Sequence, residues 1–207
     1  MGKEYVGPPE NMAIRAALSV FLVGATTLAL FFPMTMRWSD PETAKPVIGC
    51  FLLAFSVIWL IMLIYSIKDQ DPFGIFLNGI FGAFLGLSSG LSFLMGLFAI
   101  ANGVKLDFAH VDGFAHVFQA ILMLVVAFVG GGLMWSLFPS FIILFVFFGG
   151  LGFIELGLLH GSNMMWLAPL LGLVGVYYTY VAIALYINAS FQENKLPLGG
   201  PLFKRKD

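Results

Sequence analysis

Residues 73–100 read FGIFLNGIFGAFLGLSSGLSFLMGLFAI, and this stretch decides the class of the protein. It contains no charged side chain, and it exceeds the about 20 apolar residues that a helix needs to cross a bilayer. A stripe runs along it at every fourth position, because Asn78 is followed by Gly82, Gly86 and Gly90. The stretch therefore predicts a membrane-spanning helix with one face of small residues.

Glycine is a poor helix former, about 1 kcal/mol worse than alanine at each site. In lipid, however, small residues let two helix backbones approach closely, and this contact drives helix association. We therefore expect Gly82, Gly86 and Gly90 to form a helix-packing face. The same face could instead line a narrow pore, and both interpretations hold if Asn78 and Phe81 lie where the stripe meets a lumen.

The rest of the chain has the same character. It has 207 residues, of which 60% are hydrophobic and 10% are charged, whereas about a quarter are charged in a soluble domain. Six apolar segments are long enough to cross a bilayer: 14–35, 47–67, 73–100, 115–136, 139–160 and 164–190. These segments predict an all-α integral membrane protein, with six transmembrane helices per protomer in a small bundle with a central pore. We expect this domain to cover 14–192, between an N-terminal segment, 1–13, and a C-terminal tail, 193–207.

The distribution of lysine and arginine predicts the orientation, because cytoplasmic loops carry an excess of both. Six crossings place both termini on one side. Seven basic residues lie on that side and three on the other: Lys3, Arg15, Lys68, Lys195, Lys204, Arg205 and Lys206 against Arg37, Lys45 and Lys105. Both termini are therefore expected in the cytoplasm.

Several classes of function are excluded by what the sequence lacks. The net charge is −1, which does not suit a nucleic-acid-binding protein. Cys50 is the single cysteine, and no metal-ligand spacing or phosphate-binding loop is present. No pair of catalytic groups can be assembled at one depth in the membrane. We therefore expect no enzyme activity, no metal and no cofactor, and we expect the function to reside inside the bundle.

Few titratable residues lie within or beside the apolar segments. Glu155 is the only acidic residue well inside an apolar run, where an isolated charge costs at least about 2.5 kcal/mol. It is either a proton-binding group that lines a pathway or a carboxyl group hydrogen-bonded to a neighbouring helix or subunit. His110, His116 and His160 fall on the outer side, where they form an external pH sensor or are ordinary loop residues. Tyr180 and Asn188 in the last span could offer hydrogen bonds within the bundle.

Three motifs together resemble the acetate uptake transporter family, whose bacterial members are called succinate–acetate permeases. They are DPFGIFLNGIFGAF (71–84), LFVFFGG (144–150) and YVAIALYINASFQENKLPLGG (180–200). The resemblance covers roughly residues 47–200. Family members begin the first helix with an Asn-Pro-Ala-Pro-Leu-Gly motif, which is associated with substrate passage. This chain has GPPENMAIRAAL (7–18) at that place, and only GATTLAL (24–30) is similar.

The resemblance implies a homohexamer in a prokaryotic cytoplasmic membrane, with one pore through each protomer. In this family the first, third and fifth helices narrow the pore, and matching by motif assigns Val23, Phe81 and Gly150 to these positions. Phe73 belongs to the same third-helix motif. The implied solutes are small monocarboxylates, namely acetate and also succinate, transported in a proton-linked manner. Glu155 and His160 are the candidates for binding protons, and Asn78, Tyr180 and Asn188 are candidates for the solute path.

Two other functions fit the same residues. An amide or urea channel with external pH sensitivity would have a similar size, and the outer histidines suit it. A membrane subunit that only packs against other chains would use the glycine faces for those contacts.

Overall fold

The computed structural model describes residues 10–38, 40–104, 109–200 and 202. The helices are α1 (Glu10–Ala25), α2 (Phe32–Thr35), α3 (Pro41–Lys68), α4 (Pro72–Ile80), α5 (Ser89–Ala101), α6 (Ala109–Gly131), α7 (Leu137–Glu155) and α8 (Met164–Phe191). Two wide π-helical turns, Thr26–Phe31 and Phe81–Ser88, continue α1 into α2 and α4 into α5. A short 3₁₀ turn, Gly161–Asn163, precedes α8. The side chain of His110 and the loop positions 105–108, which include Lys105, lie outside this description.

Within the described residues, six helical stretches are long and apolar enough to cross a membrane, which confirms the predicted six-span, all-α fold. They are Met12–Thr35, Thr43–Lys68, Pro72–Ala101, Val111–Gly131, Leu137–Glu155 and Met165–Phe191. The shortest has 19 residues. At 1.5 Å per residue it is about 28 Å long, close to the about 30 Å of a hydrocarbon core. The chain is therefore an integral membrane protein.

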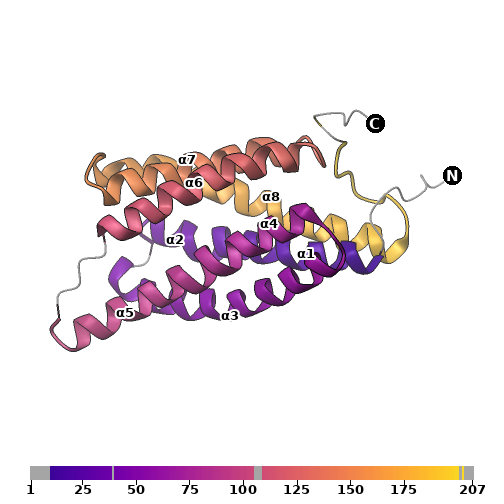
Figure 1. Cartoon of the computed structure of the whole chain (residues 1–207). Coiled ribbons are helices and arrows are strands. Elements are labelled where there is room, and N and C mark those ends of the chain that lie inside the picture. The colour runs from indigo at the N-terminus through magenta and orange to yellow at the C-terminus, as the bar shows by residue number, and fades with distance from the viewer. Residues whose placement is uncertain (1–9, 39, 105–108, 201, 203–207) are drawn as a thin grey trace.

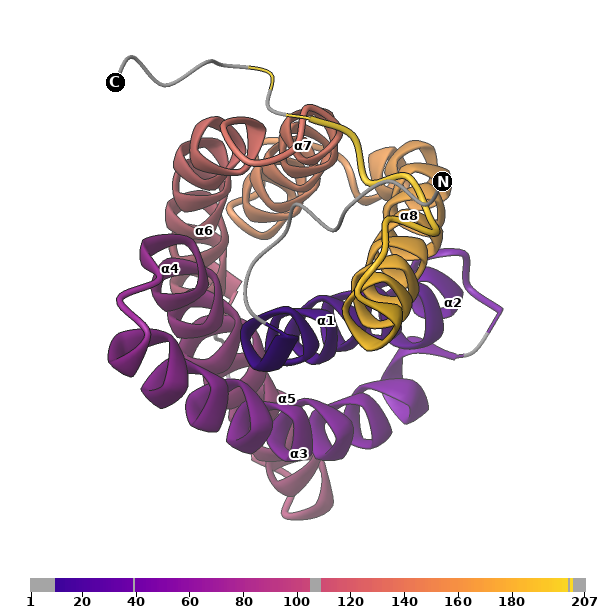
Figure 2. The same ribbon diagram turned by 90° about the vertical axis from the view of Figure 1, so that its right-hand side faces the viewer.

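The spans form a closed ring whose order follows the chain, as Figure 2 shows along the bundle. α1 packs on α3, α3 packs on the α4–α5 span, and α4 continues the ring to α6. α6 then pairs with α7, α7 contacts α8, and α8 returns to α1. Because the number of crossings is even, the start of α1 and the end of α8 lie at the same end of the bundle (Figure 1).

The glycine stripe of the third span lies against α3. A Cβ atom on Gly86 would lie 2.6 Å from the Cβ of Ser56, and one on Gly90 would lie 2.9 Å from the Cγ of Leu53. Gly82 faces the same helix. Real Cβ atoms do not approach other carbon atoms so closely, so the two helices can meet at this distance only where glycine is present.

The turn between the fourth and fifth spans lies earlier than the sequence predicts. The serine- and proline-containing stretch 136–140 suggested the break, but α6 ends at Gly131 and α7 already begins at Leu137. Pro139 therefore sits in the first turn of α7. A proline is tolerated there because its missing N–H would have no acceptor within the helix.

The fifth span also ends earlier, at Glu155 rather than at residue 160. Gly157 adopts a left-handed conformation with a φ of 72°. Its N–H donates to the carbonyl of Ile154 at 3.0 Å, and the N–H of Leu158 donates to the carbonyl of Phe153 at 2.8 Å. This pair of bonds is the Schellman motif, which closes a helix with glycine. Glu155 is thus placed in the last turn of α7, at one end of the bundle.

Candidate functional site

Two of the cavities that the described residues form lie at opposite ends of the bundle. The proximal vestibule has a volume of 610 Å³ and lies at the end where α1 begins and α8 ends. The distal vestibule has a volume of 500 Å³ and lies at the other end. The proximal lining includes Val23, Phe73, Leu77, Phe141, Tyr178 and Asn188. The distal lining includes Lys45, Ser92, Asp112, His116, Gln119 and Glu155. The two vestibules share no lining residue among the described positions.

Buried side chains separate the two vestibules at mid-span. On the third span, Phe81 follows the proximal lining and precedes the distal lining, and it is 1% exposed. Met123 and Leu144 occupy the corresponding positions on α6 and α7, and both are fully buried. We call these three residues the middle layer. The ring of Phe81 packs on Trp59 of α3 with a centroid distance of 5.6 Å.

Aromatic rings shape the inner end of the proximal vestibule. Phe141 contacts Phe73 edge to face, with ring centroids 6.2 Å apart, and Tyr178 with centroids 5.7 Å apart. The hydroxyl of Tyr178 lies 3.1 Å from the Oγ of Ser140, so its polar end is satisfied inside the bundle. The surface that a solute would meet here is therefore mostly apolar, with Val23 on its α1 side.

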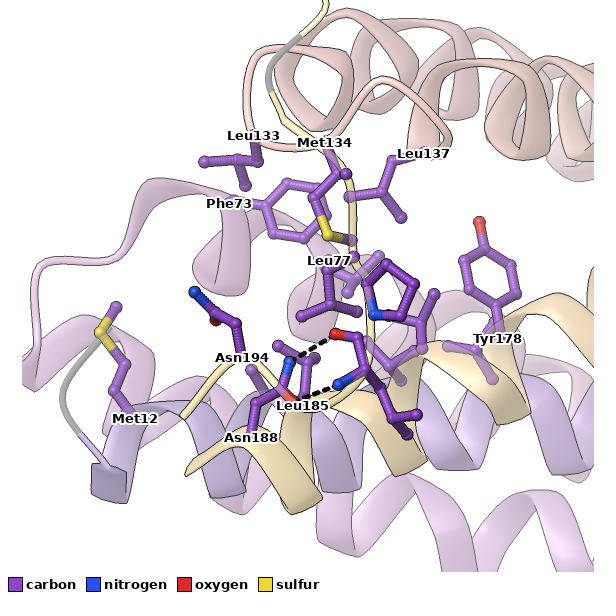
Figure 3. Close-up of a pocket in the computed structure, with 18 of the residues that line it drawn as sticks. Met12, Phe73, Leu77, Leu133, Met134, Leu137, Tyr178, Leu185, Asn188 and Asn194 are labelled. Atoms are coloured by element: carbon purple, nitrogen blue, oxygen red, sulfur yellow. Dashed lines mark hydrogen bonds between the residues drawn. The ribbon is translucent and has the colours of Figure 1, made fainter. Parts of the chain in front are cut away.

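The chain after α8 crosses the mouth of the proximal vestibule, as Figure 3 shows. We call residues 193–200 the C-terminal strap. Asn188 holds it with both ends of its amide. The Oδ1 accepts the N–H of Leu196 at 2.8 Å, and the Nδ2 donates to the carbonyl of the same residue at 2.8 Å. The described part of the predicted C-terminal tail is thus seated on the bundle.

Two further contacts fix the strap beyond Leu196. The hydroxyl of Tyr180 donates to the carbonyl of Pro197 at 2.7 Å. The backbone N–H of Trp135, in the α6–α7 turn, donates to the carbonyl of Gly200 at 2.7 Å. Tyr180 and Asn188, both assigned to the solute path from the sequence, therefore both hold the strap, but only Asn188 lines the proximal vestibule.

The distal vestibule contains a cluster of charged and polar side chains. Asp112 and His116 project from α6 at helical spacing, Glu155 comes from the last turn of α7, and Lys45 comes from the start of α3. The Nδ1 of His116 lies 2.7 Å from the Oε2 of Glu155. The Oγ of Ser92 donates to the Oδ2 of Asp112 at 3.3 Å. Glu155 is therefore hydrogen-bonded to a neighbouring helix and also lines the cavity, and its proton-binding role stays a prediction.

Besides Phe81 of the middle layer, four residues assigned to the site from the sequence line neither vestibule: Tyr180, Asn78, Gly150 and His160. Asn78 is buried on the α3 side of the third span, where its Nδ2 donates to the Oγ of Ser66 at 3.2 Å. Gly150 faces α8, because a Cβ atom on it would lie 2.8 Å from the Cδ1 of Leu167. His160 is exposed beyond α7, and its Nδ1 lies 3.0 Å from the Oγ of Ser162.

Sequence reasoning gave too little weight to the polar residues of the fourth span. His116 and Gln119 stand in an otherwise apolar run, and intramembrane polar residues are a signal of function. The pairing of His116 with Glu155 could not be foreseen, because the two residues are 39 positions apart and their contact depends on helix rotation. Among the described residues, no group of three or more His, Cys, Asp or Glu side chains could hold a metal ion.

Comparison with known proteins finds similarity to a solved structure. No protein-family model matches the sequence, and no curated protein matches it significantly. The structure of the bacterial acetate channel SatP superimposes with a TM-score of 0.73 at 18% sequence identity. The alignment covers 89% of this chain and 98% of that chain. The resemblance that the sequence motifs indicate is thus confirmed at the level of architecture: this chain has the six-span fold of a bacterial acetate channel.

Proposed function

We propose that this protein is a channel or transporter for small monocarboxylates, with acetate as the first candidate solute. The observation that carries the proposal is the pair of vestibules, which enter the bundle from opposite ends and stop at a middle layer of buried side chains. The fold likeness to an acetate channel supports the choice of solute. Succinate is a second candidate, which the family resemblance implies.

A carboxylate is expensive to place in hydrocarbon, so a protein path must provide polar contacts at each end. In the proposed path, the polar cluster of the distal vestibule receives the solute, and the proximal vestibule, which is apolar at its inner end, conducts it to Asn188 and the strap. Between them, the solute must displace the ring of Phe81 or the side chains of Met123 and Leu144. The middle layer therefore acts as the gate, and Val23 borders it on the proximal side.

We further propose that transport is linked to protons through Glu155. This carboxyl group lines the distal vestibule, and its Oε2 lies 2.7 Å from the imidazole Nδ1 of His116. A proton can therefore pass between these two side chains, which both border the vestibule. His160 lies outside the vestibule, so it has a smaller part in this scheme.

The distribution of basic residues supports an orientation with both termini in the cytoplasm of a prokaryotic cell. The proximal vestibule then faces the cytoplasm, and the distal vestibule faces outward. Large apolar side chains such as Phe21, Phe98 and Val176 are exposed on the outside of the bundle, where lipid or neighbouring protomers would cover them. A homohexamer with one path per protomer is the assembly that we propose, following the family resemblance.

An amide or urea channel is the alternative that one observation favours. The distal vestibule contains two carboxyl groups and one ammonium group, so it does not concentrate anions. A neutral amide would enter it as readily as a carboxylic acid.

Uptake into proteoliposomes distinguishes these functions. The purified chain is reconstituted, and uptake of radiolabelled acetate, succinate and urea is compared across a pH gradient with protein-free vesicles as the reference. Acetate uptake above the reference, faster than urea uptake, supports the proposal. Faster urea uptake would favour the amide channel, and no uptake of any of the three would favour a packing subunit.

A further inference from the structure

The buried side-chain amide of Gln119 in the distal vestibule has no part in the proposed transport path. Gln119 of α6 is 2% exposed and lines the vestibule. Its Nε2 has no hydrogen-bond partner among the described residues. Leaving a buried donor unpaired is costly, and most buried polar side chains in proteins are paired. A buried amide that lines a cavity and has an unpaired donor is a candidate for binding a solute in that cavity.

A second recognition group lies one helical turn away. His116 precedes Gln119 by three positions on α6, so both side chains lie on the same helix face. The ring of His116 is held on two sides, by Glu155 at its Nδ1 and by Phe148, which stacks on it at an interplanar angle of 7°. When Nδ1–H donates to Glu155, the Nε2 of the neutral ring is a hydrogen-bond acceptor. The helix face thus presents one donor and one acceptor side by side.

The charges around this face do not select an anion. Asp112 shares the α6 face, Glu155 reaches it from α7, and Lys45 reaches the vestibule from α3. Two carboxylates therefore face one ammonium and one imidazole, so the described lining has no net positive charge with His116 in either protonation state. A carboxylate anion would also place an acceptor against the acceptor nitrogen of His116.

We propose that Gln119 is a solute-binding residue, and that it recognises the neutral form of a short-chain carboxylic acid. The Nε2–H of Gln119 donates to the carbonyl oxygen, and the hydroxyl of the acid donates to the Nε2 of His116. This inference rests on the proposed function and specifies the chemical form in which the solute is bound. The acid keeps its proton at this site, so it enters the middle layer without a charge.

The test compares labelled acetate uptake by reconstituted wild-type protein and the variant Gln119→Leu. We expect the half-saturation concentration to rise by about three- to tenfold, the loss of one hydrogen bond. Thr35→Val is the matched control, because the hydroxyl of Thr35 lines the same vestibule but already donates to the carbonyl of Phe31 at 2.7 Å. It should leave the value within about twofold of wild type. If Gln119→Leu does not purify, Gln119→Met removes the amide at similar length.

Competition by acetamide tests the neutral form, because acetamide is shaped like acetic acid and stays uncharged at every pH used. It presents the same carbonyl acceptor and an adjacent N–H donor. We expect unlabelled acetamide to compete with acetate in wild type and to compete more weakly in Gln119→Leu. Absence of competition would show that the ionised carboxylate is bound and would overturn the inference. If the wild type transports acetate and Gln119→Leu has the same half-saturation concentration, the inference is overturned but the transport function stands. If the wild-type protein shows no acetate uptake, the proposed function itself is wrong.

Discussion

The imidazole Nδ1 of His116 lies 2.7 Å from the carboxyl Oε2 of Glu155, and this contact joins α6 to the last turn of α7 in the wall of the distal vestibule. Both side chains are only partly exposed, 16% for His116 and 24% for Glu155. Each of the two ionisable side chains has the other as its hydrogen-bond partner, and both line an open cavity. Both residues belong to membrane spans, and ionisable side chains inside such spans are rare and commonly mark a functional pathway.

Replacing Glu155 with glutamine removes the titrating group but keeps the size and one hydrogen-bonding oxygen. We expect the pH dependence of acetate uptake to change, so that it reflects only the ionisation of acetate itself. The profile is measured in proteoliposomes with the protein-free leak subtracted. Glu193→Gln on the exposed strap is the control and should retain the wild-type profile. A Glu155→Gln profile that superimposes on wild type would remove the proton role.

Truncating Phe81 to alanine opens the middle layer. We expect passive solute flux to rise, because the ring is 1% exposed and stands between the linings of the two vestibules. Stability in detergent should fall by about 3–5 kcal/mol, as for other buried phenylalanines. Phe98→Ala, which removes a 70% exposed ring from α5, is the control for both measurements. An unchanged flux in Phe81→Ala would exclude Phe81 from the gate.

Gly82, Gly86 and Gly90 pack against α3, and we call this contact the glycine seam. Two substitutions in the same span, one inside the seam and one outside it, test its importance. Gly86→Ala places a methyl group 2.6 Å from the Cβ of Ser56 and should push α3 away, lowering the thermal stability. Gly96→Ala meets no atom within 4 Å and should be neutral or stabilising by up to about 1 kcal/mol. Thermal unfolding in detergent measures both. Equal effects of the two substitutions would show that the seam does not depend on close approach.

Asn188→Ala should release the C-terminal strap. The substitution removes two hydrogen bonds to Leu196, each 2.8 Å long. We therefore expect the population of molecules with a detached strap to increase by about tenfold. Trypsin cleavage after Lys195 in detergent measures that population, because cleavage of a transiently open segment follows its opening equilibrium. Asn102→Ala, which changes a local contact at the end of α5, should leave the cleavage rate unchanged. The same rate in Asn188→Ala as in wild type would mean that other contacts hold the strap.

Much of the fold can be predicted from this sequence because membrane spans are long apolar runs, and 73–100 alone establishes the class. The ends of the helices were less predictable. Pro139 suggested a turn but belongs to the first turn of α7, and Gly157 ends that helix before residue 160. The position of such a residue relative to a helix end depends on how the folded helices pack, and the local sequence does not show it.

The candidate site was less accessible to sequence reasoning, because it depends on which way each helix faces. Asn78 and Gly82 share one stripe, and both lie on the α3 side. Phe81, one position before Gly82, is buried against Trp59 of α3 and lies along the span between the linings of the two vestibules. Asn188 seemed a path residue from its polarity, and its contact with Leu196 became visible only when the chain beyond α8 was placed.

Chemical blocking of each vestibule tests most directly whether solute passes through the protomer. Ala16 lines the proximal vestibule and Ala115 lines the distal one, so each can be changed to cysteine with little disturbance, in a background where Cys50 is replaced by serine. The protein is labelled with a bulky thiol reagent in detergent and then reconstituted for acetate uptake. Wild-type protein, labelled at the exposed Cys50 of α3, is the control. The account predicts that labelling Ala16→Cys or Ala115→Cys reduces uptake to that of protein-free vesicles while labelled wild type stays active; full uptake by both labelled variants would contradict it.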